Sequence, residues 1–399
     1  MQTRLTDLIG ESRQKDEVEA ILRSCVHCGF CNAVCPTYQL TGDERDGPRG
    51  RIYLMKQALE GRPATRLTQR HLDRCLTCLS CETACPSGVR YGQLLEAGRA
   101  VVDREAGRSF HDALRRRLIV RMFSYRRRFE ALLNLARKTR LLLPESLRSK
   151  IPPKPAVAAW PEPRHGRKML ILPGCVQQPL APAIDVAAAR VLDQLGVTLT
   201  PVSAGGCCGA LACHLSEPGL ALAFARQNID ACRPYLEQGA EAIVMTASAC
   251  GVMAKDYGRL LRHDPVYAEE AARFSAAVKD VGEVLASEDL SKLKKTRKKI
   301  AFHSPCTLQH GQKLIGVVEG LLEQVGYQLT VVADPHLCCG SAGAYSLLQP
   351  EISKQLLTNK LKTLEAGRPD LIATANIGCL SYLQSVRPGK IVHWVELLS

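Results

Sequence analysis

The sequence predicts an α+β protein of several domains, with a helical N-terminal domain and a C-terminal α/β domain made of two repeated units. Two cysteine patterns carry this prediction. One occurs twice between residues 25 and 86, and the other, Cys-Cys-Gly, occurs once in each of two similar stretches of the second half. At 399 residues, with 46% hydrophobic and 23% charged residues, the chain is long enough to bury more than one core.

The first pattern is C-x2-C-x2-C-x3-C-P, and both copies, at 25–36 and 75–86, follow it without deviation. This is the spacing of bacterial two-cluster ferredoxins, in which three closely spaced thiolates bind one [4Fe-4S] cluster and the fourth Cys ligates the other cluster. The proline after the fourth Cys stops any preceding helix. The expected ligand sets are Cys25, Cys28, Cys31 and Cys85 for one cluster, and Cys75, Cys78, Cys81 and Cys35 for the other.

Two alternatives for these cysteines are a zinc site and a disulfide framework. Zinc takes four ligands, usually as two separated pairs, and requires neither a third Cys in the run nor the closing Cys-Pro. Disulfides need an oxidising compartment, yet the first residues lack the apolar core of a signal peptide. No apolar run is as long as a membrane span. We therefore expect a reducing cytoplasm as the location, with the cysteines serving as thiolate ligands.

The net charge of +14 is concentrated in two segments. Residues 104–150 hold 14 Lys and Arg against 4 Asp and Glu, and residues 292–299 add six positive charges. Because the remainder is nearly neutral, this distribution argues against a nucleic-acid-binding surface and indicates local basic segments.

Residues 1–105 are expected to form the cluster domain. A turn is expected at 46–50, and Gly61 is expected to end the helix at 51–60. Hydrophobic periodicity predicts short helices at 14–24, 51–60, 64–74 and 91–107.

Residues 106–167 form a basic segment followed by a linker. Apolar residues recur at helical spacing, and the Arg triplets 115–117 and 126–128 lie between them. One interpretation is a basic amphipathic helix on an anionic membrane. The other is a helical hairpin whose apolar face packs on the protein and whose arginines lie in water. Five prolines between 151 and 167 predict a linker. The apolar residues are Leu114, Leu118, Ile119, Met122 and Phe123, then Phe129, Leu132, Leu133 and Leu135.

The second half is an internal repeat, with units at 168–290 and 291–399. Each unit reads strand, helix, strand, Cys-Cys-Gly loop, helix, strand, Cys, which predicts α/β units with parallel strands. The matching stretches are 168–175 with 299–306, 207–209 with 338–340, and 243–250 with 371–379. The expected helices are 181–195, 217–238, 311–325 and 350–366, ended by Gly196, Gly239, Gly326 and Gly367.

Each repeat places its cysteines at strand ends, where open α/β sheets gather ligands. Adjacent cysteines do not form an unstrained disulfide, so their presence indicates metal binding or redox chemistry. The alternative is that small thiols only pack a tight turn before glycine. Cys213 and Cys232 lie outside the repeated pattern. The expected sets are Cys175, Cys207, Cys208 and Cys250, then Cys306, Cys338, Cys339 and Cys379.

The sequence contains no G-x-G-x-x-G after a strand and no G-x-x-x-x-G-K-[ST]. Iron–sulfur clusters transfer electrons, whereas oxidation of a substrate by hydride transfer needs a flavin or nicotinamide. The chain therefore offers an electron path without a substrate-oxidising cofactor of its own.

Twin cluster motifs followed by two Cys-Cys-Gly repeats resemble the iron–sulfur subunits of respiratory flavoenzymes. This group includes glycolate oxidase, anaerobic glycerol-3-phosphate dehydrogenase and heterodisulfide reductase. The strings most similar to glycolate oxidase iron–sulfur subunits are CVHCGFC at 25–31, GDERDGPRGRIYL at 42–54, HLDRC at 71–75, CPSGVRY at 85–91, PCTLQH at 305–310, LCCGSAG at 337–343 and TANIGC at 374–379.

The resemblance implies a subunit of a glycolate, or other 2-hydroxy acid, oxidoreductase that passes electrons from a partner's FAD to a quinone or another acceptor. It implies an FAD-binding subunit, a second flavoprotein-like subunit and a place in the cytoplasm or on the cytoplasmic face of the inner membrane. It implies that substrate oxidation occurs on the flavoprotein partner, so that this chain has no catalytic residue. Glycerol-3-phosphate or lactate oxidation, or a thiol or quinone reductase of the heterodisulfide reductase type, are the alternatives.

One departure from the resemblance concerns the end of each repeat. The fuller family pattern ends in C-x-x-C, but Ala247 and Asn376 stand at the first of those positions. Five-thiol sites of the heterodisulfide reductase type therefore cannot form unchanged, and four thiols remain in each repeat.

Overall fold

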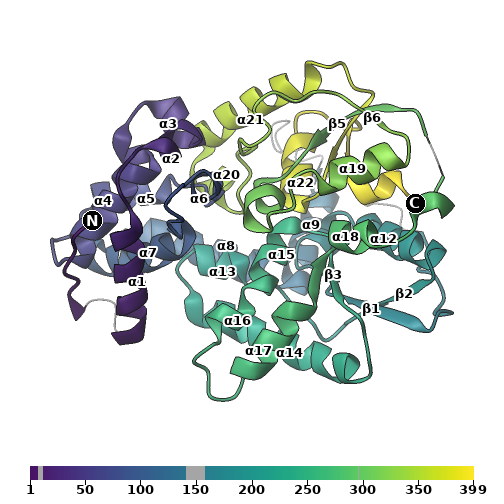
Figure 1. Cartoon of the computed structure of the whole chain (residues 1–399), viewed down its shortest axis with the longest axis horizontal. Coiled ribbons are helices and arrows are strands. Elements are labelled where there is room, and N and C mark those ends of the chain that lie inside the picture. The colour runs from purple at the N-terminus through teal and green to yellow at the C-terminus, as the bar shows by residue number, and fades with distance from the viewer. Residues whose placement is uncertain (8–11, 141–157, 295) are drawn as a thin grey trace. The chain divides into compact units, whose positions relative to one another are not determined.

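The computed structural model describes residues 1–7, 12–140, 158–294 and 296–399 (Figure 1). It divides into two compact units. The first contains Met1–Arg116, Gln309–Gly311 and Asp334–Lys360, and the second contains Arg117–Leu308, Gln312–Ala333 and Leu361–Ser399.

The N-terminal part of the first unit is helical, as the sequence predicts. Its core consists of apolar side chains from α1, α4 and α7, and Leu22, Met55, Leu59 and Leu94 are completely buried there. Proline occupies the first turn of α3 and α4, where its fixed φ and missing N–H do no harm. The helices are α1 (Ser12–Ser24), α2 (Phe30–Ala33), α3 (Pro36–Thr41), α4 (Pro48–Leu59), α5 (Arg66–Asp73), α6 (Ser80–Thr83) and α7 (Tyr91–Ala106), with a 3₁₀ turn at Glu44–Asp46.

All four helices predicted in this part are present, with shifted ends. The prediction of a turn through residue 50 is wrong at its end, because α4 already begins at Pro48. The expected end at Gly61 agrees with the structure, where this residue adopts a positive φ of 88°.

Part of the second repeat belongs to the same compact unit as the N-terminal cysteine motifs. This part includes α20 (Tyr345–Leu348) and most of α21 (Pro350–Glu365). The Tyr345 hydroxyl donates to the carbonyl oxygen of Arg74 at 3.0 Å, and a ring nitrogen of His310 lies 3.0 Å from the Thr83 hydroxyl. The two compact units therefore do not coincide with the domains expected from the sequence, whose boundaries lie at 105, 167 and 290. Those domain boundaries stay a prediction.

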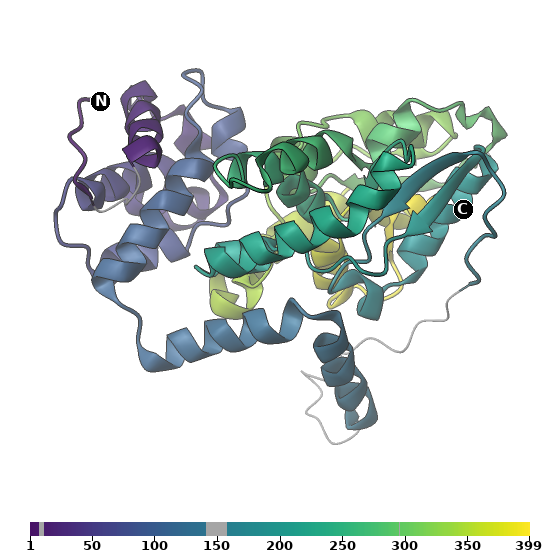
Figure 2. The ribbon, with the colours of Figure 1, turned by 90° about the horizontal axis from the view of Figure 1, so that it is seen from below.

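The basic segment forms two helices, α8 (Phe110–Phe123) and α9 (Arg126–Lys138), joined by a short bend (Figure 2). Ile119, Val120, Phe129 and Leu133 are buried, whereas Leu114, Leu118, Leu132 and Leu135 are exposed. The expectation that all the arginines lie in water is wrong for one of them. The Arg116 guanidinium is buried and donates to Asp73 at 2.9 Å and to Asp112 at 3.0 Å. Residues 141–157 of the basic segment and linker lie outside the described residues.

The second unit contains two four-stranded parallel sheets with the same strand order, which confirms the predicted pair of α/β repeats. The first sheet has the order β2-β1-β3-β4 and the second has the order β6-β5-β7-β8. Their strands are β1 (Arg167–Ile171), β2 (Val197–Pro201), β3 (Ile243–Met245) and β4 (Val278–Asp280), then β5 (Lys299–His303), β6 (Gln328–Leu329), β7 (Leu371–Thr374) and β8 (Ile391–His393). Strands β4 and β8 were not predicted, because each follows the cysteine with which the recognised repeat pattern ends, Cys250 in the first unit and Cys379 in the second.

The two repeats pack against each other where β3 and β7 end. The Ser248 N–H donates to the Ala375 carbonyl oxygen at 3.1 Å, and the Ser248 and Thr307 hydroxyls lie 2.7 Å apart. Helices of the first repeat are α11 (Gln177–Leu180), α12 (Ala183–Gln194), α13 (Ala210–His214), α14 (Pro218–Glu237), α15 (Ser248–Lys255), α16 (Tyr257–Leu260), α17 (Ala268–Ala277) and α18 (Val281–Ala286). Those of the second are α19 (Val317–Gln324), α20, α21 and α22 (Ile377–Gln384).

Two details of the predicted repeat helices are wrong. The helix expected from residue 311 begins only at Val317, because a π-helical turn occupies Thr307–Gly311 and Gly316 has a positive φ of 77°. Gly367 follows the end of α21 but is not left-handed; the left-handed residue in this turn is Arg368, with φ of 50°. Gly367 is needed for space instead, since a Cβ there would lie 2.5 Å from the Thr330 Cβ.

Candidate iron–sulfur centres

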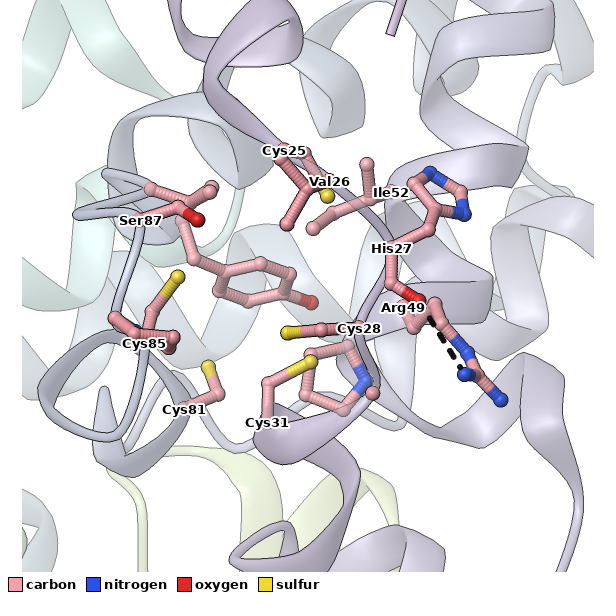
Figure 3. A pocket seen from close by; sticks show the side chains of 15 residues that line it. Cys25, Val26, His27, Cys28, Cys31, Arg49, Ile52, Cys81, Cys85 and Ser87 are labelled. Atoms are coloured by element: carbon pink, nitrogen blue, oxygen red, sulfur yellow. Dashed lines mark hydrogen bonds between the residues drawn. The ribbon is translucent and has the colours of Figure 1, made fainter.

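The first cavity of the N-terminal region collects cysteines from both motifs. It is lined by Cys25, Cys28 and Cys31 of the first motif and by Cys81 and Cys85 of the second. Figure 3 shows the sulfur atoms of these five side chains directed into one common space.

The second cavity is lined by the complementary set. Cys75, Cys78 and Cys81 come from the second motif and Cys35 from the first. Each cavity therefore holds the three closely spaced cysteines of one motif together with the fourth cysteine of the other. Cys81 lines both cavities, so the two are immediate neighbours.

Both motifs use the same backbone geometry to wrap around their cavity. The residue before the second Cys has a positive φ, 57° at His27 and 55° at Thr77, and the residue after it has 87° at Gly29 and 61° at Leu79. Left-handed conformations are costly for residues other than glycine and persist only where the surrounding structure requires them. The chain therefore tolerates strain at equivalent positions to turn three thiols inward, and the short helices α2 and α6 then lead to the fourth Cys.

The sulfur spacing fits a cluster better than a zinc ion. In a tetrahedral zinc site with bonds of about 2.3 Å, neighbouring sulfurs lie about 3.8 Å apart. Among the described residues, no three of these eight sulfurs lie within 4.8 Å of one another. The described residues thus show no compact group of these thiols of the kind that a single zinc ion needs.

The surroundings of these thiols shift their pKa values in different directions. Burial raises the pKa of Cys25, and it raises the pKa of Cys31 to about 11. Burial also raises the pKa of Cys81. At Cys75 burial acts in the same direction, but the guanidinium groups of Arg51 and Arg99 outweigh it and lower the pKa below its usual value. Because iron binds the thiolate, these two guanidinium groups favour the form of Cys75 that a cluster would need.

A network of buried charges surrounds the second cavity. Asp46 is completely buried and accepts hydrogen bonds from His71 at 2.8 Å and Arg74 at 2.6 Å. The Arg51 side chain is 1% exposed and lies 3.8 Å from the same carboxylate. These residues were not predicted as part of the site, although Asp46, Arg51 and His71 fall inside the strings that carry the family resemblance.

The first repeat gathers its four predicted thiols from the segments that follow β1, β2 and β3. The sulfurs of Cys175 and Cys207 lie 3.3 Å apart, and Cys208 contacts both Cys207 and Cys250. The proton that Cys175 shares with Cys207 raises the pKa of Cys175 and lowers that of Cys207. Cys207 also accepts the Gly209 N–H at 3.4 Å, and a positive φ of 86° suits this glycine.

The second repeat has the same Cys-Cys-Gly turn. The Gly340 N–H donates to the Cys338 sulfur at 3.4 Å, and Gly340 has a φ of 87°. Cys338 and Cys339 belong to the first compact unit, whereas Cys306 and Cys379 belong to the second.

Asn376, where the fuller pattern has a cysteine, makes structural contacts. Its side-chain oxygen accepts the Ala249 N–H at 3.3 Å and its amide donates to the Cys379 sulfur at 3.6 Å. The departure from C-x-x-C is therefore a hydrogen-bonded link between the repeats.

Family models match both halves of the chain. Residues 21–89 match the 4Fe-4S dicluster domain, and residues 169–255 and 300–384 each match the Cysteine-rich domain. The N-terminal region therefore carries two [4Fe-4S] clusters, as the motif spacing predicts.

Full-length relatives decide the family. The chain is 49% identical to the glycolate oxidase iron-sulfur subunit of Escherichia coli over 100% of its own length and 98% of the relative's. The chain belongs to the glycolate oxidase iron–sulfur subunit family. It is also 30% identical to the probable glycolate oxidase iron-sulfur subunit of Bacillus subtilis, over 95% of its own length and 94% of that relative's.

More distant similarities cover less of the chain or show only the fold. Lactate utilization protein A of Bacillus licheniformis is 27% identical over 54% of this chain and 92% of its own length. A crystal structure of a hypothetical protein from Helicobacter pylori has a TM-score of 0.59, covering 97% of this chain and 72% of that one, at 11% identity. Among the described residues, we find no helix with the length and apolar composition needed to cross a bilayer.

Proposed function

We propose that the chain is the electron-transferring iron–sulfur subunit of a complex that oxidises glycolate. The single observation that supports this most is the 49% identity to a glycolate oxidase iron–sulfur subunit over the whole chain. The chain contains the cysteines for two adjacent clusters but no Gly-rich flavin or nicotinamide motif. Oxidation of the 2-hydroxy acid therefore occurs on an FAD-bearing partner, and this chain carries the electrons onward to a quinone or another acceptor.

We assign the ligands in a crossed arrangement. Cys25, Cys28, Cys31 and Cys85 hold one cluster, and Cys75, Cys78, Cys81 and Cys35 hold the other. The composition of the two cavities supports this assignment, because each contains one complete set. Cys81 faces both cavities and is assigned to the second cluster by its place in the motif.

The test of this function uses a tagged chain purified with its partners from its natural host. We expect a flavoprotein to co-purify, and the complex to oxidise glycolate with the natural acceptor. Alanine at Cys28 or Cys78 should abolish turnover, whereas alanine at Cys213, outside the motifs and the repeated pattern, should leave it unchanged. Lactate or glycerol 3-phosphate as the preferred substrate would overturn the assignment of glycolate, and lactate is the second candidate because of the partial match to a lactate utilization protein.

The first repeat carries a further metal or redox site built from Cys175, Cys207, Cys208 and Cys250. The convergence of these thiols supports it, and packing alone does not require sulfurs 3.3 Å apart. Full-length protein should then bind more iron or another metal than two clusters account for. Replacing Cys207 and Cys208 by Ser should remove that excess, and replacing Cys213 by Ser should not. Equal metal contents in all three proteins would leave these cysteines as packing or dithiol groups.

The exposed basic face of α8 and α9 attaches the chain to an anionic membrane surface on the cytoplasmic side, where a quinone is accessible. Exposed leucines on both helices and exposed arginines at 115, 117, 121 and 126–128 support this proposal.

A further inference from the structure

Arg51 is a buried cation beside the second cavity. Its side chain projects from α4 and is 1% exposed. Its Nε donates to the His71 carbonyl oxygen at 2.8 Å, and a terminal nitrogen donates to the Thr37 hydroxyl at 3.1 Å. An arginine keeps its charge at every physiological pH, so burial here places a permanent positive charge in a region of low dielectric.

The charge of Arg51 is only partly compensated by its surroundings. The nearest carboxylate, Asp46, lies 3.8 Å away and is already bound by Arg74 at 2.6 Å. One carboxylate therefore serves two guanidinium groups. Arg99 adds a third, which donates to the carbonyl oxygens of Leu72 and Cys75 at 2.8 and 2.9 Å. Three guanidinium groups thus lie near the second cavity, and two of them share the carboxylate of Asp46.

These groups act on the sulfurs of the second cavity. Arg51 lines it together with Cys35 and Cys75. The Tyr91 hydroxyl donates to the Cys75 sulfur at 3.6 Å, and the Thr37 hydroxyl lies 3.3 Å from the Cys35 sulfur. Hydrogen bonds to the sulfurs and nearby positive charge both favour the reduced form of a cluster, because reduction adds an electron.

The first cavity lacks a comparable buried charge among the residues that line it. Arg49, two positions before Arg51 on α4, is 37% exposed and paired with the partly exposed Glu44 at 2.6 Å. Figure 3 shows its guanidinium directed away from the sulfurs. The amino group of Met1 donates to the Cys25 carbonyl oxygen at 3.0 Å. Cys28 is exposed, so water screens charges on this side.

We propose that Arg51 makes the cluster held by Cys35, Cys75, Cys78 and Cys81 the more easily reduced of the two. Arg51 is therefore a positioning residue: it does not ligate the cluster, but its charge acts through the cluster ligands and favours the cluster on which the electron resides. The proposal rests on the crossed ligand assignment of the preceding section. A single electron entering the chain then occupies the buried centre beside Arg51, and a second electron occupies the centre beside the exposed Cys28, which separates the two electrons that a reduced flavin delivers.

The test is a redox titration of the anaerobically purified full-length chain, followed by electron paramagnetic resonance. Wild-type protein should be reduced in two one-electron steps. Arg51→Gln should lower the reduction potential of the more easily reduced cluster by at least about 59 mV, which is a factor of ten in the equilibrium constant of a one-electron step. The potential of the other cluster should not change. Arg51→Lys keeps the charge and should stay within threefold of wild type, which a purely structural role of the guanidinium would not predict.

The matched control is Arg49→Gln, which removes the same group from the same helix at a partly exposed position, where Glu44 pairs with it, and should shift neither step more than threefold. If Arg51→Gln does not retain the second cluster, Arg99→Gln should shift the same step in the same direction and Arg99→Lys should not. A single step for both clusters, or equal potentials for Arg51→Gln and Arg51→Lys, would overturn the proposal. Because the titration needs neither substrate nor partner, loss of glycolate oxidation would bear on the proposed function alone.

Discussion

Paired cysteine substitutions give a decisive result on which thiols share a cluster. In the crossed arrangement Cys35 and Cys78 belong to one cluster, so replacing both by Ala removes two ligands from that cluster and none from the other. The doubly substituted chain should keep about four of its roughly eight iron atoms, together with one unperturbed cluster spectrum. Replacing Cys28 and Cys35 instead removes one ligand from each cluster, and no unperturbed spectrum should remain.

The structure explains why the two pairs should differ. Cys35 and Cys78 line the second cavity, and Cys28 lines the first. Cys28 and Cys35 are nevertheless only seven positions apart in the sequence, so an arrangement by sequence proximity predicts the opposite outcome for both pairs. Iron analysis and electron paramagnetic resonance of anaerobic full-length protein provide the assay. One intact cluster in the Cys28, Cys35 variant would refute the reasoning.

Three further predictions concern packing, pH and attachment. Gly98→Ala places a Cβ 2.5 Å from the sulfur of the buried Met55 and should lower the free energy of unfolding in urea by about 1–3 kcal/mol. The double variant with Met55→Ala should lose less stability than the sum of the two single variants. Full additivity would contradict the close contact. Burial lowers the pKa of His393 to about 4, so its neutral form contributes stability above pH ~6.5 that is lost as the pH falls towards 4. Burial also raises the pKa of Asp280 to about 6, which changes the stability in the opposite direction over this pH range. The measurement is therefore the difference in unfolding free energy between wild type and His393→Gln, which should change by roughly 1 kcal/mol between about pH 7 and 5.5. A difference that stays constant with pH would contradict the prediction. Changing Arg121, Arg126 and Arg127 to Gln should weaken binding to anionic vesicles by up to about 1 kcal/mol per residue, whereas the same change at Arg62, Arg66 and Arg70 should not; equal effects would leave the basic face as a solvated surface.

The sequence predicted those parts of the molecule that depend on spacing along the chain. The cluster motifs have a characteristic interval, and the repeat was visible because matching stretches recur in the same order at nearly the same offset. The strand order of the two sheets is likewise the one that repeated α/β units would share. Helix ends were less accurate, as α19 shows, because a π-helical turn leaves no simple periodic signal.

Features that depend on contacts between distant residues were not predicted. Asp46, Arg51 and His71 come from separate elements, and nothing in their local sequence indicates that they share one buried network. The same holds for Tyr345, whose hydroxyl bonds to Arg74. Asn376 was recognised as a departure from the family pattern, but its role in joining the repeats became visible only through its hydrogen bond to Ala249.

The central claim is that electrons from a partner's flavin pass through the two clusters of this chain. Rapid mixing of the oxidised complex with glycolate, followed by visible absorption and freeze-quenched electron paramagnetic resonance, tests it most directly. We predict that flavin reduction comes first, that the clusters are reduced next, and that the natural acceptor is reduced last. Reduction of the acceptor at the full rate while the clusters stay oxidised would contradict the account.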